Sequence, residues 1–268
     1  MSNLGPPQRK SRSLLIAGGT DGIGFALVYS ELQRSKYSKI FVLGRDFQNV
    51  DQLLEQQKRT DTTPPEAAHR RIMKLPCDIT KLDEIFSLLA KIKDDPIHDF
   101  VLTIGSFLRG TIADIMPTNT AAENEDDKTQ GDVVADHFHL NCVSTIHLIR
   151  LVVPKLMKGD SQILVCTASL AIMARSPYAL QSATKAALRS FVDTLRIELK
   201  GRTRVMNLMP PSVDTKIFAK AGDYRNTDGY PPPSRIASTM KFMLDSPFDI
   251  CIPEVLIEQH HFDAGHES

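Results

Sequence analysis

The sequence lacks tryptophan, has only four cysteines and carries no surplus charge, since 32 Lys and Arg residues balance 32 Asp and Glu residues. Binding to nucleic-acid phosphates or to an anionic membrane surface requires a basic surplus, so the balanced charge argues against both partners. No apolar run approaches the roughly 20 residues of a membrane span. The longest run, residues 163–174, is interrupted by Ser and Thr. Composition therefore argues against a membrane protein, a disordered chain and a disulfide scaffold.

The four cysteines form no recognisable pattern. Cys77, Cys142, Cys166 and Cys251 lie among apolar residues, with neither a CxxC pair nor metal-ligand spacing. Such cysteines are typical of reduced core thiols, so we expect a cytoplasmic protein without a metal site. The N-terminus has no apolar segment of the kind found in secretory signals.

Short apolar runs alternate with amphipathic stretches along most of the chain. This alternation predicts βαβ units and a parallel sheet covered by helices on both faces. We expect residues 1–12 to form a disordered leader and residues 13–268 to fold as one domain with about seven strands. The expected strands cover residues 14–17, 39–43, 72–75, 100–104, 162–166, 205–208 and 254–257. The expected helices cover residues 23–32, 50–57, 82–92, 133–157, 177–200 and 235–244.

Two stretches interrupt the alternation. Residues 109–130 are polar and acidic, which favours a solvated surface insertion over a docking site. Residues 216–233 are irregular and end in three consecutive prolines. Long irregular segments of compact domains often cover binding sites, so we expect the second stretch to form a lid that sets substrate choice.

A cluster of glycines lies between the first strand and the first helix. Glycines at this junction let the chain turn sharply and bring backbone N–H groups against a pyrophosphate. The cluster therefore predicts a dinucleotide-binding turn in a doubly wound, Rossmann-type α/β fold, with a purely structural turn as the alternative. The candidate cofactor-binding residues of this turn are Gly18, Thr20, Asp21, Gly22, Ile23 and Gly24.

The end of the second strand bears on the choice of cofactor. NAD-binding folds usually place an acid there to bind the ribose 2′-hydroxyl, whereas an arginine accepts a 2′-phosphate. This chain has Gly44 followed by Arg45, which favours NADP(H). Asp46 is one residue further on, so NAD is the alternative.

Further segments match the short-chain dehydrogenase/reductase family in order. Together with the motifs above, they make the chain resemble this family from about residue 13 to residue 258. One follows the third strand and is similar to the segment that contacts adenine. Another is similar to the Asn-Asn-Ala-Gly turn, here without either Asn, and a third to the turn whose Thr contacts the nicotinamide carboxamide. The resemblance implies that these segments bind the cofactor through Asp78, Ile79, Gly105, Pro210, Val213 and Thr215.

The same resemblance identifies a catalytic region that departs from the family. Asn141 is similar to the Asn that holds a proton-relay water, and Lys185 is similar to the active-site Lys. The family's Tyr, four residues before this Lys, is replaced by Gln181, and its usual Ser is replaced by Ala168, with Ser169 beside it as a possible helper. A Gln amide can donate a hydrogen bond but cannot act as an acid near neutral pH.

Tyr178 is a second candidate for the proton donor. It precedes Lys185 by seven residues, two helical turns, and the sequence Ser176-Pro177 predicts that a helix begins just before it. The Tyr-x6-Lys spacing resembles that of enoyl-acyl-carrier-protein reductases, in which the Tyr stabilises an enolate oxygen. A core or rim aromatic residue is the alternative.

Taken together, these features predict NADP(H)-dependent hydride transfer to an apolar carbonyl or conjugated enoyl compound. Gln181 and Ala168 favour a rival prediction, an inactive family member that binds the dinucleotide as a structural or sensing ligand or acts as an interaction subunit. The resemblance also implies a homodimer or homotetramer. The histidines, among them His137 and His139, lack metal-ligand spacing, so we expect them to be buried with ordinary partners or exposed.

Overall fold

The computed structural model describes residues 12–60, 71–115 and 132–260, with the side chains of residues 58–60 excepted. Residues 1–11 of the expected leader, residues 116–130 of the expected insertion and residues 261–268 of the expected domain lie outside the described residues. The last residue of the expected leader, Arg12, belongs instead to the first strand and is buried. Its guanidinium lies in a network of ion pairs that holds it against the sheet.

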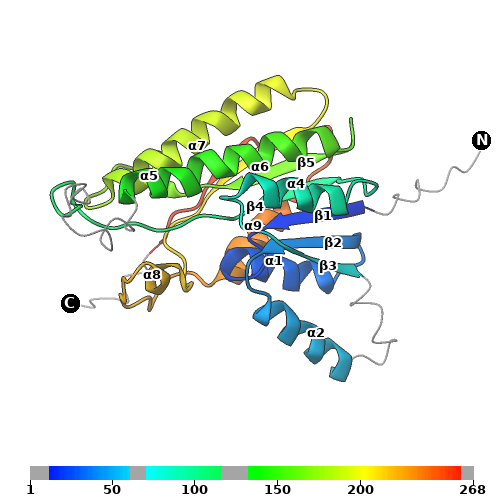
Figure 1. Ribbon diagram of the computed structural model, residues 1–268, viewed down its shortest axis with the longest axis horizontal. Helices are drawn as coiled ribbons and strands as arrows, with labels where there is room; N and C mark the ends of the chain where they lie inside the picture. Colours follow the sequence, from blue (N-terminus) through cyan, green and yellow to red (C-terminus); the bar gives the residue numbers. More distant parts are fainter. Residues whose placement is uncertain (1–11, 61–70, 116–131, 261–268) are drawn as a thin grey trace, which may run out of the picture.

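Seven parallel strands form one sheet in the order β3-β2-β1-β4-β5-β6-β7 (Figure 1). This order, with crossovers on both sides of β1, confirms the doubly wound, single-domain prediction. The strands are β1 (Arg12–Ala17), β2 (Tyr37–Gly44), β3 (Ile72–Pro76), β4 (Asp99–Leu102), β5 (Gln162–Cys166), β6 (Arg204–Met209) and β7 (Glu254–Leu256).

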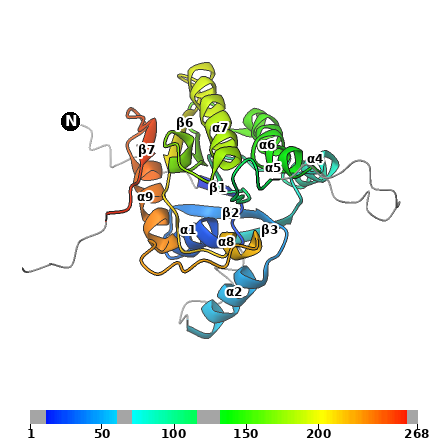
Figure 2. The same ribbon diagram turned by 90° about the vertical axis from the view of Figure 1, so that its left-hand side faces the viewer.

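The helices cover both faces of the sheet, with α1, α2 and α9 on one side and α4, α6 and α7 on the other (Figure 2). Their bounds are α1 (Gly22–Leu32), α2 (Gln48–Thr60), α4 (Leu82–Lys91), α5 (Val133–Phe138), α6 (Thr145–Val152), α7 (Ala179–Glu198), α8 (Ile217–Lys220) and α9 (Pro233–Asp245). Within the described residues, no helix is long and apolar enough to cross a membrane.

The central strands contribute side chains to two separate cores, which explains why most of their residues are apolar. In β1, Leu15 packs into the core under α4, α6 and α7, whereas Leu14 and Ile16 pack into the core under α1, α2 and α9. Successive side chains of a strand point to opposite faces, so a strand buried on both faces needs apolar residues at every position.

The helix expected over residues 133–157 is interrupted by a wider turn. Residues His139–Ser144 form a π-helical turn between α5 and α6, and residues Val153–Lys155 form a 3₁₀ turn after α6. The side chain of Thr145 donates to the carbonyl of Leu140 at 3.1 Å, which provides a partner for a backbone oxygen within the wider turn. Such turns are rare and occur frequently at functional sites.

The predicted start of α7 was wrong by two residues. The helix begins at Ala179, and Tyr178 is its N-cap residue rather than part of its first turn. The carbonyl of Pro177 accepts the N–H of Gly110 at 3.0 Å, so it makes a contact with a distant loop in place of a helical bond. The carbonyl of Tyr178 accepts the first helical bond, from Ser182 at 2.8 Å.

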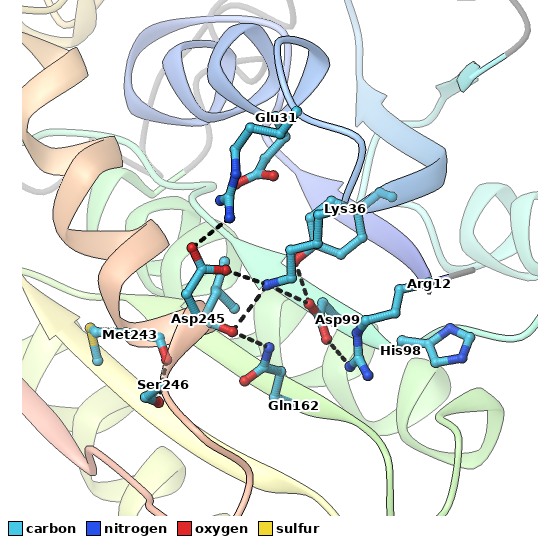
Figure 3. A network of polar contacts seen from close by, with 12 residues as sticks. Arg12, Glu31, Lys36, His98, Asp99, Gln162, Met243, Asp245 and Ser246 are labelled. Carbon is cyan, nitrogen blue, oxygen red and sulfur yellow. Dashed lines mark hydrogen bonds and ion pairs between the residues drawn. The ribbon is translucent and has the colours of Figure 1, made fainter. Parts of the chain in front are cut away.

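A network of charged residues lies at the amino ends of β1, β2 and β4, opposite the ends that form the site (Figure 3). Asp99 is fully buried and accepts hydrogen bonds from Arg12 Nη2 at 2.6 Å and from the Tyr37 hydroxyl. Lys36 Nζ lies 3.7 Å from Asp99 and 2.8 Å from Asp245 at the end of α9. The network therefore connects three strands to α9.

Candidate active site

A cavity of about 630 Å³ opens at the carboxyl ends of the strands, where ligands bind in open α/β sheets. Its walls come from the segments that follow β1, β4, β5 and β6, from the first two turns of α7, and from residues 257–259 after β7. The apolar part of the wall includes Phe107, Leu170, Met173, Ile217 and Phe218. The polar part includes Gln181 and Lys185 of α7 and side chains of the loops after β4, β5, β6 and β7.

The glycine turn between β1 and α1 is shaped to leave its backbone uncovered. Gly18 has a φ of +86°, and a Cβ on Gly24 would lie 2.2 Å from the carbonyl oxygen of Gly18. Side chains are therefore excluded at both positions, as a turn that approaches a pyrophosphate requires. Of the turn's residues, Ile23 lines the cavity directly.

Asp21 caps α1 and connects the glycine turn to the expected lid. Its Oδ1 accepts the N–H of Gly22 at 2.8 Å, and its Oδ2 pairs with Lys220 of α8 at 2.6 Å. Burial acts to raise the pKa of Asp21, but the hydrogen bonds from Lys220 and Gly22 outweigh it and lower the pKa. The lid segment thus contacts the turn through a charged pair.

Arg45 follows β2, where the sequence predicted a contact with the cofactor ribose. The side chain of Arg45 is 77% exposed, and its Nη1 lies 3.9 Å from Asp78 Oδ2. Asp46 Oδ1 accepts the N–H of Gln48 at the start of α2, so that carboxylate already has a structural partner. Burial acts to raise the pKa of Asp78, but hydrogen bonds from Thr80 and the charge of Arg45 lower it.

Some residues of the predicted cofactor site contribute through their backbone. The side chain of Ile79 packs into the core, so only its backbone is available to a ligand. Thr215, after β6, lies against the glycine turn, because a Cβ on Gly22 would be 3.4 Å from its methyl group. Pro210 and Val213 line the cavity beside it.

Lys185 and Asn141 meet at Gly105. A Cβ on Gly105 would lie 2.9 Å from both Lys185 Nζ and Asn141 Oδ1, so only glycine leaves room for the two side chains. Lys185 is buried, and burial lowers its pKa, although the neighbouring Cys166 and Cys142 thiols act in the opposite direction. Burial also raises the pKa of Cys166 to about 12, so this thiol is neutral.

Within the described residues, Lys185 forms no ion pair. A buried ammonium is costly unless polar groups satisfy it, and the hydroxyls of a bound ribose would do so. The uncovered glycine turn and this lysine therefore fit a dinucleotide. Within the part of the chain that the structure describes, no cluster of three His, Cys, Asp or Glu side chains could hold a metal ion.

Gln181, Ala168 and Ser169 all line the cavity near Lys185, as their sequence positions predicted. Gln181 is 4% exposed, and its Oε1 accepts the backbone N–H of Leu108 at 3.3 Å. Ser169 is held by its backbone, since its N–H donates to the carbonyl of Pro210 at 2.9 Å.

Tyr178 lines the outer part of the same cavity and contacts a residue that sequence reasoning missed. Arg225, on the lid segment, donates to the Tyr178 hydroxyl at 3.2 Å and to Asp223. Its guanidinium lies 4.5 Å from the ring centroid of Phe218 and 4.9 Å from that of Phe107. The hydrogen bond to Asp223 raises the pKa of Arg225, so its charge is permanent.

His137 is the second functional candidate that the sequence did not indicate. It is buried, and its Nδ1 lies 3.1 Å from both Ser106 Oγ and Asn141 Nδ2. It also forms a hydrogen bond with Gln181. Its spacing of four residues before Asn141, which places both on one face of a helix, was the available signal.

The sequence profile described as short chain dehydrogenase matches residues 12–226. The chain belongs to the short-chain dehydrogenase family. An uncharacterised oxidoreductase of Bacillus subtilis, DltE, is 26% identical over 219 residues, which cover 80% of this chain and 76% of that protein. An 11-beta-hydroxysteroid dehydrogenase of Arabidopsis thaliana, 1A, is 24% identical over 216 residues, which cover 81% of this chain and 56% of that protein.

Solved structures share the fold at low sequence identity. A short-chain dehydrogenase/reductase from Brucella melitensis matches with a TM-score of 0.71 and 19% identity, over 92% of this chain and 94% of that one. A short chain dehydrogenase from Burkholderia cenocepacia in complex with NADP matches with a TM-score of 0.70 and 19% identity, over 93% of this chain and 96% of that one. These likenesses establish the fold of this member of the short-chain dehydrogenase family.

Proposed function

We propose that this protein is an NADP(H)-dependent oxidoreductase that transfers hydride to an apolar carbonyl or conjugated enoyl compound. The observation that carries the proposal is Lys185, a buried ammonium without an ion-pair partner among the described residues, at the base of a cavity beside a glycine turn. When bound, the dinucleotide supplies the hydride.

The choice of NADP(H) over NAD(H) rests on Arg45. Its guanidinium is exposed beside the end of β2, whereas the competing carboxylate of Asp46 caps α2. An arginine in this position offers charge-assisted hydrogen bonds to a 2′-phosphate. The relatives from Burkholderia cenocepacia and Thermococcus sibiricus were solved with NADP and 5-hydroxy-NADP, which supports the same class of cofactor here.

Tyr178 is the proposed proton donor, and Lys185 and Asn141 are the proposed anchors of the cofactor ribose and a relay water. The Tyr178 oxygen accepts a hydrogen bond from Arg225, so the phenol's own hydrogen is left to point into the cavity. After this hydrogen leaves, the negative charge on the oxygen faces a guanidinium. Ser169, beside the substrate region, is a proposed helper.

The proposed substrate is apolar because aromatic and aliphatic side chains form most of the outer cavity wall. Phe107, Phe218 and Tyr230 pack edge to face around it, with ring centroids 4.8 Å and 6.0 Å apart in successive pairs. We further propose that the protein acts in a reducing cytoplasm, where its four free cysteines would stay reduced, and as a homodimer or homotetramer.

Calorimetric titration with NADPH and with NADH tests the cofactor proposal. We expect NADPH to bind roughly 10- to 100-fold more tightly than NADH, since hydrogen bonds to a charged group contribute about 1.5–3 kcal/mol. Arg45→Ala should remove most of that difference, and Arg235→Ala, an exposed arginine on α9, serves as the control. Binding of neither dinucleotide would overturn the proposed function.

Turnover separates this proposal from its rival. NADPH oxidation is followed with phenanthrenequinone and with trans-2-nonenal, an aromatic diketone and an apolar enal. Turnover that Tyr178→Phe abolishes supports the assigned proton donor, whereas turnover unchanged in Tyr178→Phe would exclude it. Tight cofactor binding without turnover of any carbonyl or enoyl compound would favour the inactive, ligand-sensing member that Gln181 and Ala168 also suggest.

A further inference from the structure

A polar cluster behind the cavity connects the loop after β4 to α5 and the π-helical turn. Asn141 Oδ1 accepts the backbone N–H of Ser106 at 3.0 Å. The amide nitrogen of Asn141 is therefore a donor on its other side, where it lies 3.1 Å from His137 Nδ1 and 3.3 Å from His137 Nε2. It also lies 3.0 Å from Ser106 Oγ and 3.1 Å from the carbonyl oxygen of His137.

His137 lies in surroundings that favour its neutral form. Burial lowers its pKa, and the positive charge of Lys185 lowers it further, whereas the contact with Gln181 acts to raise it. A neutral imidazole has one N–H to donate.

The Gln181 amide is oriented by the backbone N–H of Leu108, which lies 3.3 Å from Gln181 Oε1 and can only donate. The oxygen of the amide therefore faces away from the cavity, and its NH₂ group is left to face inward. Gln181 lines the cavity three residues after Tyr178 and four before Lys185, so all three share one side of α7.

We propose that Gln181 is a catalytic residue that donates a hydrogen bond to the reacting oxygen of the substrate, and that His137 is a positioning residue that orients its amide. This inference rests on the proposed function. As the substrate carbon accepts the hydride, the electron pair of the C=O bond moves to oxygen and Tyr178 transfers its proton to form the O–H bond. Gln181 keeps its protons and supplies the hydrogen bond that Ala168 cannot.

The test compares Gln181→Met with Gln181→Glu, in the turnover of phenanthrenequinone by NADPH. Removing one preorganised donor costs about 10²- to 10³-fold in kcat, so we expect that loss in Gln181→Met with NADPH affinity unchanged. A Glu carboxylate has no hydrogen to donate at pH 7.5 but gains one when protonated. The kcat ratio of Gln181→Glu to Gln181→Met should therefore rise as the pH falls from 7.5 to 5.5, whereas a purely structural role leaves the ratio constant.

Three further variants test the positioning role and the folding of the site. His137→Gln retains a donor for Gln181 and should keep most of kcat, whereas His137→Leu should lose about 10-fold or more with little change in KM. Thr184→Val replaces a buried hydroxyl on the same helix that, among the described residues, bonds to the Gln181 carbonyl alone, and it serves as the matched control.

The outcomes separate the inference from the proposed function. Loss of turnover in Tyr178→Phe with retained turnover in Gln181→Met would show the inference to be wrong while the proposed function stands. A flat Glu-to-Met ratio across the pH range would also overturn it. Absence of turnover by the unmodified protein would remove the proposed function and this inference together, whereas the expected pattern supports both.

Discussion

We expect Asp99→Asn to destabilise the protein by about 3–5 kcal/mol, because it leaves buried cations without their carboxylate. Asp99 is 0% exposed, and the side chains of Arg12 and Lys36 that face it are each only 10% exposed. Arg12 keeps a second partner, Asp160, and Lys36 keeps Asp245. These remaining pairs place the expected loss at the lower end of the range, at about 3 kcal/mol.

Equilibrium unfolding in urea, followed by far-ultraviolet circular dichroism, measures this loss. Asp160→Asn is the matched control, because it removes a carboxylate from the same arginine, but the Asp160 side chain is 47% exposed. Asp160→Asn should lower the free energy of unfolding by about 0–1 kcal/mol, as is usual for exposed ion pairs. The double variant Arg12→Met/Asp99→Leu should lose less than Asp99→Asn, since it removes a buried charge together with its partner. Equal effects of Asp99→Asn and Asp160→Asn would refute the reasoning.

Gly105→Ala should weaken dinucleotide binding in calorimetry while the fold persists by circular dichroism, because the added Cβ would lie 2.9 Å from Lys185 Nζ and displace it; unchanged affinity would contradict this. Burial lowers the pKa of His98 and His137, so the unfolded imidazoles protonate first as the pH falls below about 6.5. The midpoint temperature of unfolding should therefore decrease as the pH is lowered from 7 to 5.5, and it should decrease by less in His98→Asn. Arg225→Leu should lower kcat more than Arg225→Lys, which retains a cation at the phenol; equal losses would count against a role for that charge.

The strands and the cofactor turn could be predicted because their signals are local. Residues 14–17 of β1 are all apolar because both faces of the sheet are covered. The glycines that follow are required because Gly18 has a positive φ and because the backbone of Gly18 lies against Gly24. The start of α7 could not be predicted from the sequence, because it depends on a hydrogen bond from the Gly110 N–H to the Pro177 carbonyl. Sequence spacing offers no information on a contact between loops nearly seventy residues apart.

The residues of α7 that line the cavity could be predicted from the sequence, but the residues that contact them could not. Lys185, Gln181 and Tyr178 share one helix face at sequence spacings that can be read directly. Arg225 reaches Tyr178 from a lid segment 47 residues further along, and its role depends on how that segment folds back. His137 acquires a partner on α7 only because α5 packs against it, and no local pattern encodes that packing.

The π-helical turn has a consequence for how this chain tolerates insertions and deletions. A wider turn accommodates an extra residue with little change in the rotational phase of α5 relative to α6. Deleting one residue from His139–Ser144 and restoring regular winding would therefore leave the imidazole of His137 on the side that faces α7. Deleting one residue from the regular turns of α6 would instead rotate α5 by about 100°, the angle per residue of an α-helix, and would turn His137 away from α7. A change of length that this segment absorbs would therefore alter the composition of the active site if it occurred a few residues later in the chain.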